Sequence, residues 1–145
     1  MSGSGVTLTY DDAEVLRMLD DVAARCGDMS DGLQIVGEVV QTSVQRNFEA
    51  GGRPGRWKPL SAKTLKYKKN GKILVDKGMA GGLLGSIHYT VGRNSVIIGT
   101  DKIYAAAHQF GYSPRNLSAR PFLMVQDEDT VEIIAELADY IEDGR

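Results

Sequence analysis

The sequence contains little of what metal sites and disulfide frameworks require. It has one cysteine, Cys26, and two histidines, His88 and His108, among 145 residues. One thiol excludes an intrachain disulfide and a thiolate cluster, and neither histidine has a partner at metal-ligand spacing. Cys26 lies on the apolar side of an expected helix, where a thiol behaves as a small hydrophobic group. The sequence therefore predicts no metal and no cofactor.

Signatures of catalysis and of membrane insertion are also missing. The chain has no Gly-x-Ser-x-Gly turn, no phosphate-binding Gly-x-x-x-x-Gly-Lys-Ser/Thr loop and no dinucleotide fingerprint. No apolar run approaches the ~20 residues that cross a bilayer, and the Met-Ser-Gly-Ser-Gly start lacks the features of a signal peptide. We therefore expect a non-enzymatic cytoplasmic protein that has no membrane partner.

The net charge is small, but basic residues are concentrated in one segment. A formal charge of −2 argues against a dedicated nucleic-acid binder. Nine of the 17 basic residues lie within 51–77, where Asp76 is the only acid and Trp57 is the only tryptophan of the chain. Tryptophan and arginine are common at interaction hot spots, so this segment is a candidate binding surface. The alternatives are lysines that keep a loop soluble and a tryptophan ring that fills the edge of the core.

Hydrophobic periodicity predicts helices at both ends of the chain. Apolar residues recur at helical spacing in 11–26 and in 30–49, and Gly51-Gly52 ends the second helix. A final helix over 127–143 has acids in its first turn, where the helix dipole favours them. Two apolar faces are expected to be buried. In the first helix this face comprises Val15, Leu16, Leu19, Val22 and Cys26, and in the last it comprises Val131, Ile134, Ala138 and Ile141.

The middle of the chain mixes short helices with strands. Ser61 can begin a short basic helix that ends near Lys68, and 104–110 also has a helical pattern. The period changes to two over 86–99, which predicts a β-hairpin, and 121–125 is expected to form a short strand with proline first.

This order of elements indicates one α+β domain over 1–145, with helices covering a small antiparallel sheet. We expect residues 1–9 to be flexible, and the glycine-containing loops 51–60 and 78–85 to be mobile.

Acidic residues gather in the last helix, opposite in charge to the basic segment. The simplest interpretation is a solvated helix face. The alternative pairs this helix with the basic segment 53–77 of a neighbouring copy, because complementary patches fix the register between subunits. The acids are Asp127, Glu128, Asp129, Glu132, Glu136, Asp139, Glu142 and Asp143.

Three segments occur in an order that is similar to one known family. Phe48 is followed by Arg-Pro-Gly-Arg-Trp-Lys-Pro-Leu-Ser over 53–61, then by Gly-Lys-Ile-Leu-Val-Asp over 71–76. Tyr-Ala-Ala-Ala-His-Gln-Phe-Gly over 104–111 precedes Ala-Arg-Pro-Phe-Leu over 119–123. The set resembles the phage virion morphogenesis, or tail completion, family of tailed bacteriophages and prophages over about residues 30–143. The segment 77–86 departs from the family pattern because it is longer and lacks arginines after Lys77.

The resemblance implies a structural protein used late in virion assembly. It would complete the tail end before the tail joins the head, first in the cytoplasm of the bacterial host and then in the virion tail or neck. Its partners would be phage tail and neck proteins and further copies of itself in a ring, with a hexamer as the first size to test. A nucleic-acid-binding neck component that uses the basic segment 53–77 is the alternative.

The expected partner interface has two parts. The first is the basic segment with its tryptophan, and the second is a pocket formed by the 104–111 and 119–123 motifs. The residues are Arg53, Arg56, Trp57, Lys58, Lys63, Lys66, Lys68, Lys69, Lys72, His108, Gln109, Phe110 and Arg120.

Overall fold

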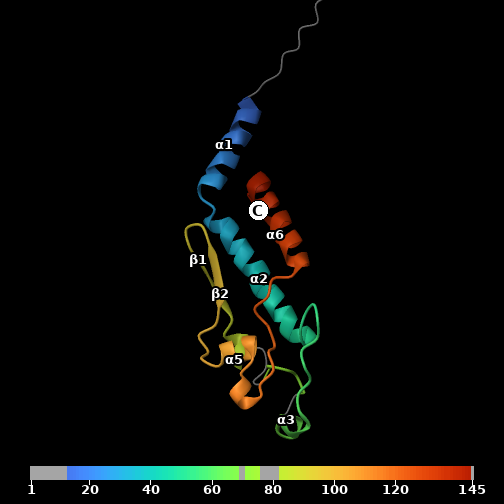
Figure 1. The fold of residues 1–145 in the computed structure, drawn as a ribbon. Helices are drawn as coiled ribbons and strands as arrows, with labels where there is room; N and C mark the ends of the chain where they lie inside the picture. Colours follow the sequence, from blue (N-terminus) through green and yellow to red (C-terminus); the bar gives the residue numbers. More distant parts are fainter. Residues whose placement is uncertain (1–12, 69–70, 76–81, 145) are drawn as a thin grey trace, which may run out of the picture.

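Two long helices that pack side by side form the centre of the structure. The computed structural model describes residues 13–68, 71–75 and 82–144. Helix α2 (Ser30–Ala50) contacts α6 (Asp127–Asp143) on one side and the hairpin of β1 (His88–Val91) and β2 (Val96–Gly99) on the other (Figure 1). The strands are antiparallel, with His88 opposite Gly99 and Val91 opposite Val96. The result is the expected α+β fold, in which α2 is the middle layer.

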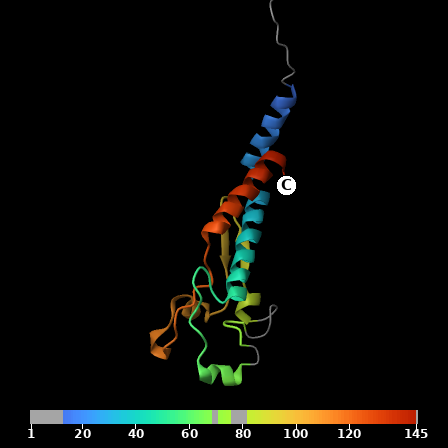
Figure 2. The same ribbon diagram turned by 90° about the vertical axis from the view of Figure 1, so that its right-hand side faces the viewer.

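The remaining helices lie at opposite ends of an elongated molecule. Helix α1 (Ala13–Gly27) extends beyond the N-terminal end of α2, whereas α3 (Ala62–Tyr67) and α5 (Ala105–Phe110) lie near the other end (Figures 1 and 2). The short α4 (Gly82–Gly85) and the 3-10 turn η1 (Ser113–Arg115) complete the described elements. In the described part of the chain, no helix has both the length and the apolar character needed to span a membrane.

Local sequence explains where α2 begins and ends. Helix α2 begins at Ser30, with Met29 at the N-cap position and no side-chain cap, and Asp28 Oδ1 just before it accepts hydrogen bonds from the Ser30 N–H (3.1 Å) and hydroxyl (2.6 Å). Gly51 ends the helix in the left-handed conformation at φ 70°, as expected, and donates to the Asn47 and Phe48 carbonyls. Within α2, Gly37 allows the hairpin to approach, because an added Cβ would lie 2.3 Å from the Tyr89 ring.

The core is formed mainly by α2 and the segments that follow it. The apolar stripe of α2 is buried, as its spacing predicts, and a tilted Phe48–Phe122 ring pair (5.5 Å between centroids) connects it to the segment after α5. The buried cluster comprises Val40, Val44, Phe48, Trp57, Val75, Leu83, Leu84, Ile87, Ala105 and Phe122.

The predicted strand at 121–125 is wrong, because side chains occupy the main-chain groups that a neighbouring strand would pair. Gln109 Oε1 accepts from the Phe122 and Leu123 N–H groups at 3.0 Å each. Asn47 Nδ2 donates to the Phe122 carbonyl (2.8 Å) and Trp57 Nε1 donates to the Pro121 carbonyl (2.9 Å). The segment bends at Leu123 and belongs to no sheet, and the only sheet of the described residues is the hairpin.

The apolar faces of α1 and α6 were predicted to be buried, and both predictions need correction. Helix α1 buries none of its residues, and Cys26 is exposed, because α1 extends past the end of α2 and packs mainly against α6. Helix α6 turns Asp129, Ile133 and Tyr140 inward, so that Val131, Ile134 and Ala138 of its predicted face are exposed and Ile141 is only partly buried. The exposed fractions on that face are 69% for Val131 and 63% for Ile134.

The two loops that were expected to be mobile have different structures. Residues 51–60 contain no helix or strand, as expected. In the second, residues 82–85 form α4, whose Leu83 and Leu84 are buried in the core. Residues 1–9 and 78–81 lie outside the described residues.

Candidate interaction surface

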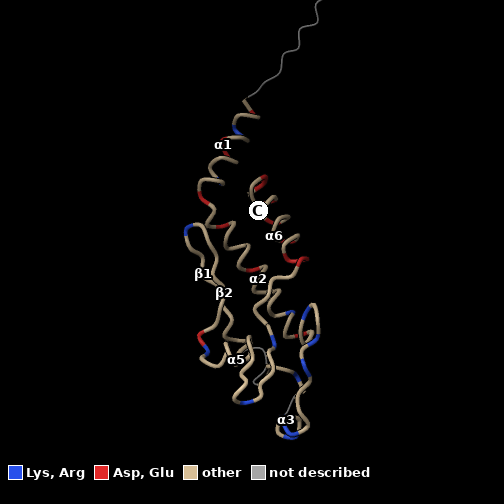
Figure 3. Tube along the Cα trace, viewed as in Figure 1, with Lys and Arg blue, Asp and Glu red and all other residues tan. Residues whose placement is uncertain are grey.

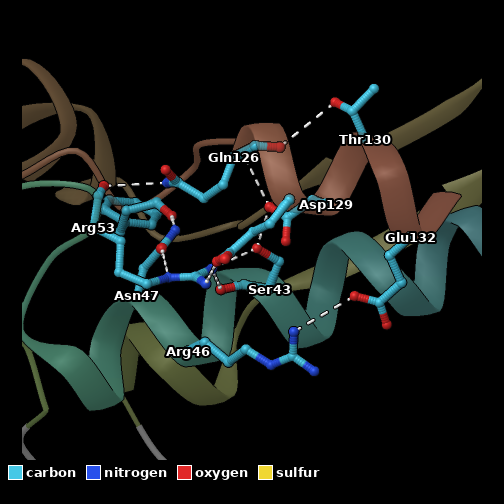
Figure 4. Close-up of polar contacts among 10 residues, drawn as sticks. Ser43, Arg46, Asn47, Arg53, Gln126, Asp129, Thr130 and Glu132 are labelled. Carbon is cyan, nitrogen blue, oxygen red and sulfur yellow. Dashed lines mark hydrogen bonds and ion pairs between the residues drawn. The ribbon is translucent and has the colours of Figure 1, made fainter.

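A polar network joins the start of the basic segment to α2 and α6. Arg53 Nε donates to Asn47 Oδ1 (2.9 Å), and its Nη2 donates to the Ser43 carbonyl (2.9 Å) and hydroxyl (2.7 Å). Its Nη1 pairs with Glu128 Oε1 at 2.5 Å. Figure 4 shows this guanidinium beside Asn47 and Ser43, between the two helices. All three guanidinium nitrogens are therefore engaged within the chain, so Arg53 positions the basic segment.

The carboxylate of Asp129 stabilises the other side of this network. Its Oδ2 accepts from the Ser43 hydroxyl and from the Gln126 N–H, the latter at 2.7 Å (Figure 4). The Gln126 side chain in turn donates to the Arg53 carbonyl at 3.1 Å. Asp129 is fully buried. The start of α6 is thus held against α2 by hydrogen bonds as well as by apolar packing.

Trp57 is a core residue. It is 6% exposed, meets Phe48 edge to face at 5.7 Å between centroids, and donates from Nε1 to the Pro121 carbonyl at 2.9 Å. Of the two interpretations of this tryptophan, the structure supports the ring that fills the edge of the core. The side chains on either side of it in sequence, Arg56 and Lys58, are exposed on the surface.

A cationic cleft lies between the basic segment and α5. It has a volume of about 1130 Å³. Six basic side chains line it, and no carboxylate of the described residues does. The six are Lys58, Lys63, Lys68, Lys102, Arg115 and Arg120. Charges of one sign around a cleft strengthen the electric field inside it. The positive charge of this cleft therefore favours an anionic partner.

Arg120 is the most buried charged residue of the cleft wall, and the partly buried His108 lies beside it. Arg120 is 8% exposed and donates from Nε to the Lys58 carbonyl (3.0 Å) and from Nη2 to the Pro59 carbonyl (3.3 Å). Its guanidinium forms no ion pair with a described carboxylate. Burial lowers the pKa of Arg120, and burial followed by the charges of Arg120 and Lys68 lowers the pKa of His108. His108 is thus held in its neutral form beside a buried positive charge.

The two ends of the molecule differ in charge. Figure 3 shows acidic residues along α1 and α6, and basic residues concentrated around α3 at the opposite end. Two ion pairs connect acidic residues of α6 to arginines of the same copy. They are Arg53–Glu128, from the basic segment, and Arg46–Glu132 (3.5 Å), from α2. Part of the charge complementarity that was expected between copies is therefore used inside the chain, at the start of α6.

Most exposed large hydrophobic residues follow the same division, apart from Ile97 on β2 and Val125 just before α6. At the first end they lie on α1 and α6, and at the other they lie on or next to α3 and α5. The first group is Val15, Leu16, Met18, Leu19, Val131 and Ile134. The second is Leu65, Tyr67, Ile103, Tyr104, Phe110 and Tyr112. Each end thus combines an apolar surface with a charge opposite to that of the other end.

The structure brings together part of the predicted interface set. Lys58, Lys63, Lys68, His108 and Arg120 line the cleft. Gln109 instead supports the 122–123 main chain, and Phe110 is 79% exposed outside the cleft.

Among the described residues, three other predicted basic residues do not line the cleft. Arg56, Lys66 and Lys72 are exposed, whereas Lys69 lies outside the described residues. A role in binding a partner stays a prediction for all of them.

Sequence reasoning missed cleft residues that come from other parts of the chain. Lys102, Tyr104, Arg115 and Asn116 line the wall opposite the basic segment. Lys102 and Arg115 are isolated basic residues without a charge cluster around them. Their only sequence signal is that they flank the 104–111 motif. Among the described residues, no three His, Cys, Asp or Glu side chains are grouped as metal ligands would be.

Comparison with known proteins now identifies the family. The sequence profile of the phage virion morphogenesis family matches residues 10–142. The "Mu-like prophage FluMu G protein 2" of Haemophilus influenzae is 31% identical over 134 residues, which cover 89% of this chain and 90% of the relative. No solved structure matches the chain. The resemblance inferred from the ordered motifs is thereby confirmed, and the chain belongs to the phage virion morphogenesis family.

Proposed function

We propose that this protein is a non-enzymatic structural component that completes the phage tail end and prepares it to join the head. It would assemble in the bacterial host and remain in the virion tail or neck. Membership of a virion morphogenesis family supports a role in particle assembly. The observation that carries the proposal is the pair of unlike ends, one apolar and acidic and the other apolar and cationic.

Unlike ends favour head-to-tail association between copies. An interface that joins two different surfaces forms a ring when its rotation closes, and a filament when it does not. A ring could act on a tail tube because repeated subunits present the same surface around one axis. We therefore propose that the protein acts as a homo-oligomeric ring, with the cationic cleft at each junction. Six copies are the first size to test.

A phage deleted for this gene and complemented in trans tests the proposal. Without the protein, we expect electron microscopy to show heads and unjoined tails, and the wild-type gene should restore whole particles. Lys58→Glu, Lys63→Glu and Lys68→Glu combined should fail to restore them. The control has charge reversals outside both the cleft lining and the predicted interface set, in Arg17→Glu and Arg93→Glu, which are exposed, and should restore particles. Whole particles from the uncomplemented deletion would refute the proposed function.

The cationic cleft also favours a second candidate, a neck component that contacts DNA. Each phosphate contact releases counterions, so the logarithm of the binding constant should fall with the logarithm of salt by about 0.9 per contact. Fluorescence anisotropy with duplex DNA at several salt concentrations measures this slope. Under our main proposal no binding is expected even at low salt. Binding that the cleft variant abolishes would favour the DNA function.

A further inference from the structure

Helix α1 presents an apolar face that no other part of the described chain (13–68, 71–75 and 82–144) covers. The exposed fractions are 51% for Val15, 54% for Leu16, 61% for Met18 and 58% for Leu19. Helix α1 is attached to α6 through Arg25, which donates to the Ile141 and Glu142 carbonyls at 2.7 Å each. A free helix of 15 residues is marginal in water, and most helical stability in proteins comes from packing an apolar face. This face therefore requires a partner.

The cleft at the other end has the size and the composition to accept a helix. Its volume of about 1130 Å³ exceeds the roughly 300–1,000 Å³ of ordinary small-molecule sites. Its apolar lining includes Tyr67 and Tyr104, which are 81% and 46% exposed. Amphipathic helices bind in such grooves by inserting residues at helical spacing, as Leu16 and Leu19 are spaced.

Charge indicates which helix the cleft would accept. Helix α1 has three acids, Glu14, Asp20 and Asp21, against Arg17 and Arg25, and Arg25 is already bound to α6. The described lining of the cleft has six cations and no carboxylate. Complementary charges of this kind fix orientation and speed association. Helix α1 therefore matches the cleft in its apolar spacing and in its charge.

The match cannot form within one copy. Helix α1 and the α3–α5 end lie at opposite ends of the elongated molecule, with the length of α2 between them (Figures 1 and 2). We infer that α1 of one copy docks in the cationic cleft of the next copy. This inference rests on the proposed assembly function and names the two surfaces that meet at each junction. Each copy then offers one α1 and one cleft. An open chain of copies therefore always has an undocked α1 at one end and an unoccupied cleft at the other.

Two variants and their mixture test this arrangement. The helix variant combines Leu16→Asp and Leu19→Asp, which are both more than half exposed and so should not unfold the chain. The cleft variant combines Lys58→Glu, Lys63→Glu and Lys68→Glu. Light scattering coupled to size exclusion should show that wild-type protein oligomerises and that each variant alone is a monomer. A mixture of the two variants retains one intact helix and one intact cleft, and should form a dimer of one copy of each.

The control for the helix variant is Arg17→Asp, which makes the same change of −2 in charge on the polar side of α1. It should assemble like the wild type, whereas the helix variant should bind at least about tenfold more weakly, or about 1.4 kcal/mol. Monomeric wild-type protein, a cleft variant that assembles alone, or a mixture that stays monomeric would each overturn the inference. Tail completion by the helix variant would also overturn it while leaving the proposed function intact. Whole particles from the phage deletion would instead refute the proposed function.

Discussion

Replacing Trp57 tests whether the family-like basic segment is built around a core residue or around a surface anchor. The indole is 6% exposed, contacts Phe48 edge to face and donates to the Pro121 carbonyl. Trp57→Ala would remove this ring and leave a cavity where the basic segment meets α2. We therefore expect a large loss of stability that is present in the monomer and does not depend on assembly.

The magnitude follows from the buried ring. Truncation of a buried tryptophan to alanine costs about 3–5 kcal/mol, as transfer and cavity terms combined. With a slope of about 2 kcal/mol per molar urea, the unfolding midpoint should fall by about 2 M. Trp57→Phe keeps an aromatic ring but leaves the Pro121 carbonyl without its donor, which costs about 1–3 kcal/mol. The expected order of stability is wild type, then Trp57→Phe, then Trp57→Ala.

Urea unfolding followed by far-ultraviolet circular dichroism measures this order. The signal must come from circular dichroism, because Trp57 is the only tryptophan and its fluorescence is lost in both variants. Lys58→Ala is the matched control, since this neighbouring side chain is exposed and its removal should change stability by no more than about 0.5 kcal/mol. If Trp57→Ala unfolds within 1 kcal/mol of wild type but fails to assemble, Trp57 is a surface anchor and the reasoning is wrong.

Three further substitutions test other parts of the fold. Gly37→Ala should destabilise the protein by about 1–3 kcal/mol, because the added methyl group overlaps the Tyr89 ring, and thermal unfolding would measure the loss. Arg53→Ala should cost about 1–3 kcal/mol in urea unfolding, since it removes the donor to buried groups on α2. Burial and the charge of Arg120 lower the pKa of His108 in the folded protein. As the pH falls below about 6.5, the unfolded chain therefore binds more protons than the folded protein, and the free energy of unfolding decreases. His108→Gln should unfold with a weaker dependence on pH between 7.5 and 5.5.

Two of these substitutions, Gly37→Ala and Arg53→Ala, have a control in the same chain. Gly27→Ala meets no atom within 4 Å and should leave stability unchanged or slightly raised. Arg56→Ala removes an exposed guanidinium and should change stability by no more than about 0.5 kcal/mol. Equal losses for Gly37→Ala and Gly27→Ala would contradict the proposed Tyr89 contact. An unchanged pH dependence in His108→Gln would show that another group causes the acid destabilisation.

Helix existence was predictable because it depends on local spacing. The 3.6-residue period in 30–49, the glycine pair at its end and the acids at the start of 127–143 are short-range signals, and α2 and α6 follow them closely. The same holds for the hairpin, whose two-residue alternation is interrupted by Arg93-Asn94-Ser95. The strand expected at 121–125 failed, because Gln109, Asn47 and Trp57 supply its hydrogen-bond partners from distant positions.

Burial was less predictable than secondary structure. The apolar stripe of α1 and the Val131–Ile134 face of α6 have the pattern of buried faces, but no described part of the chain covers them. A periodic pattern indicates that a face seeks a partner, and it does not indicate whether that partner lies in the same copy. This ambiguity is physical, since an intermolecular helix interface and an intramolecular one use the same residue types.

Spacing and composition along the chain were enough to predict the helices other than α4, the hairpin, the α+β class, the family motifs and the concentration of basic residues in 51–77. Three-dimensional packing is what shows that Arg53 and Trp57 are held inside the fold, and that Lys102 and Arg115 join Lys58 and Arg120 around one cleft. It also separated α1 from that cleft by the length of the molecule. The reason is that clefts and burial depend on contacts between residues far apart in sequence, which no local pattern encodes.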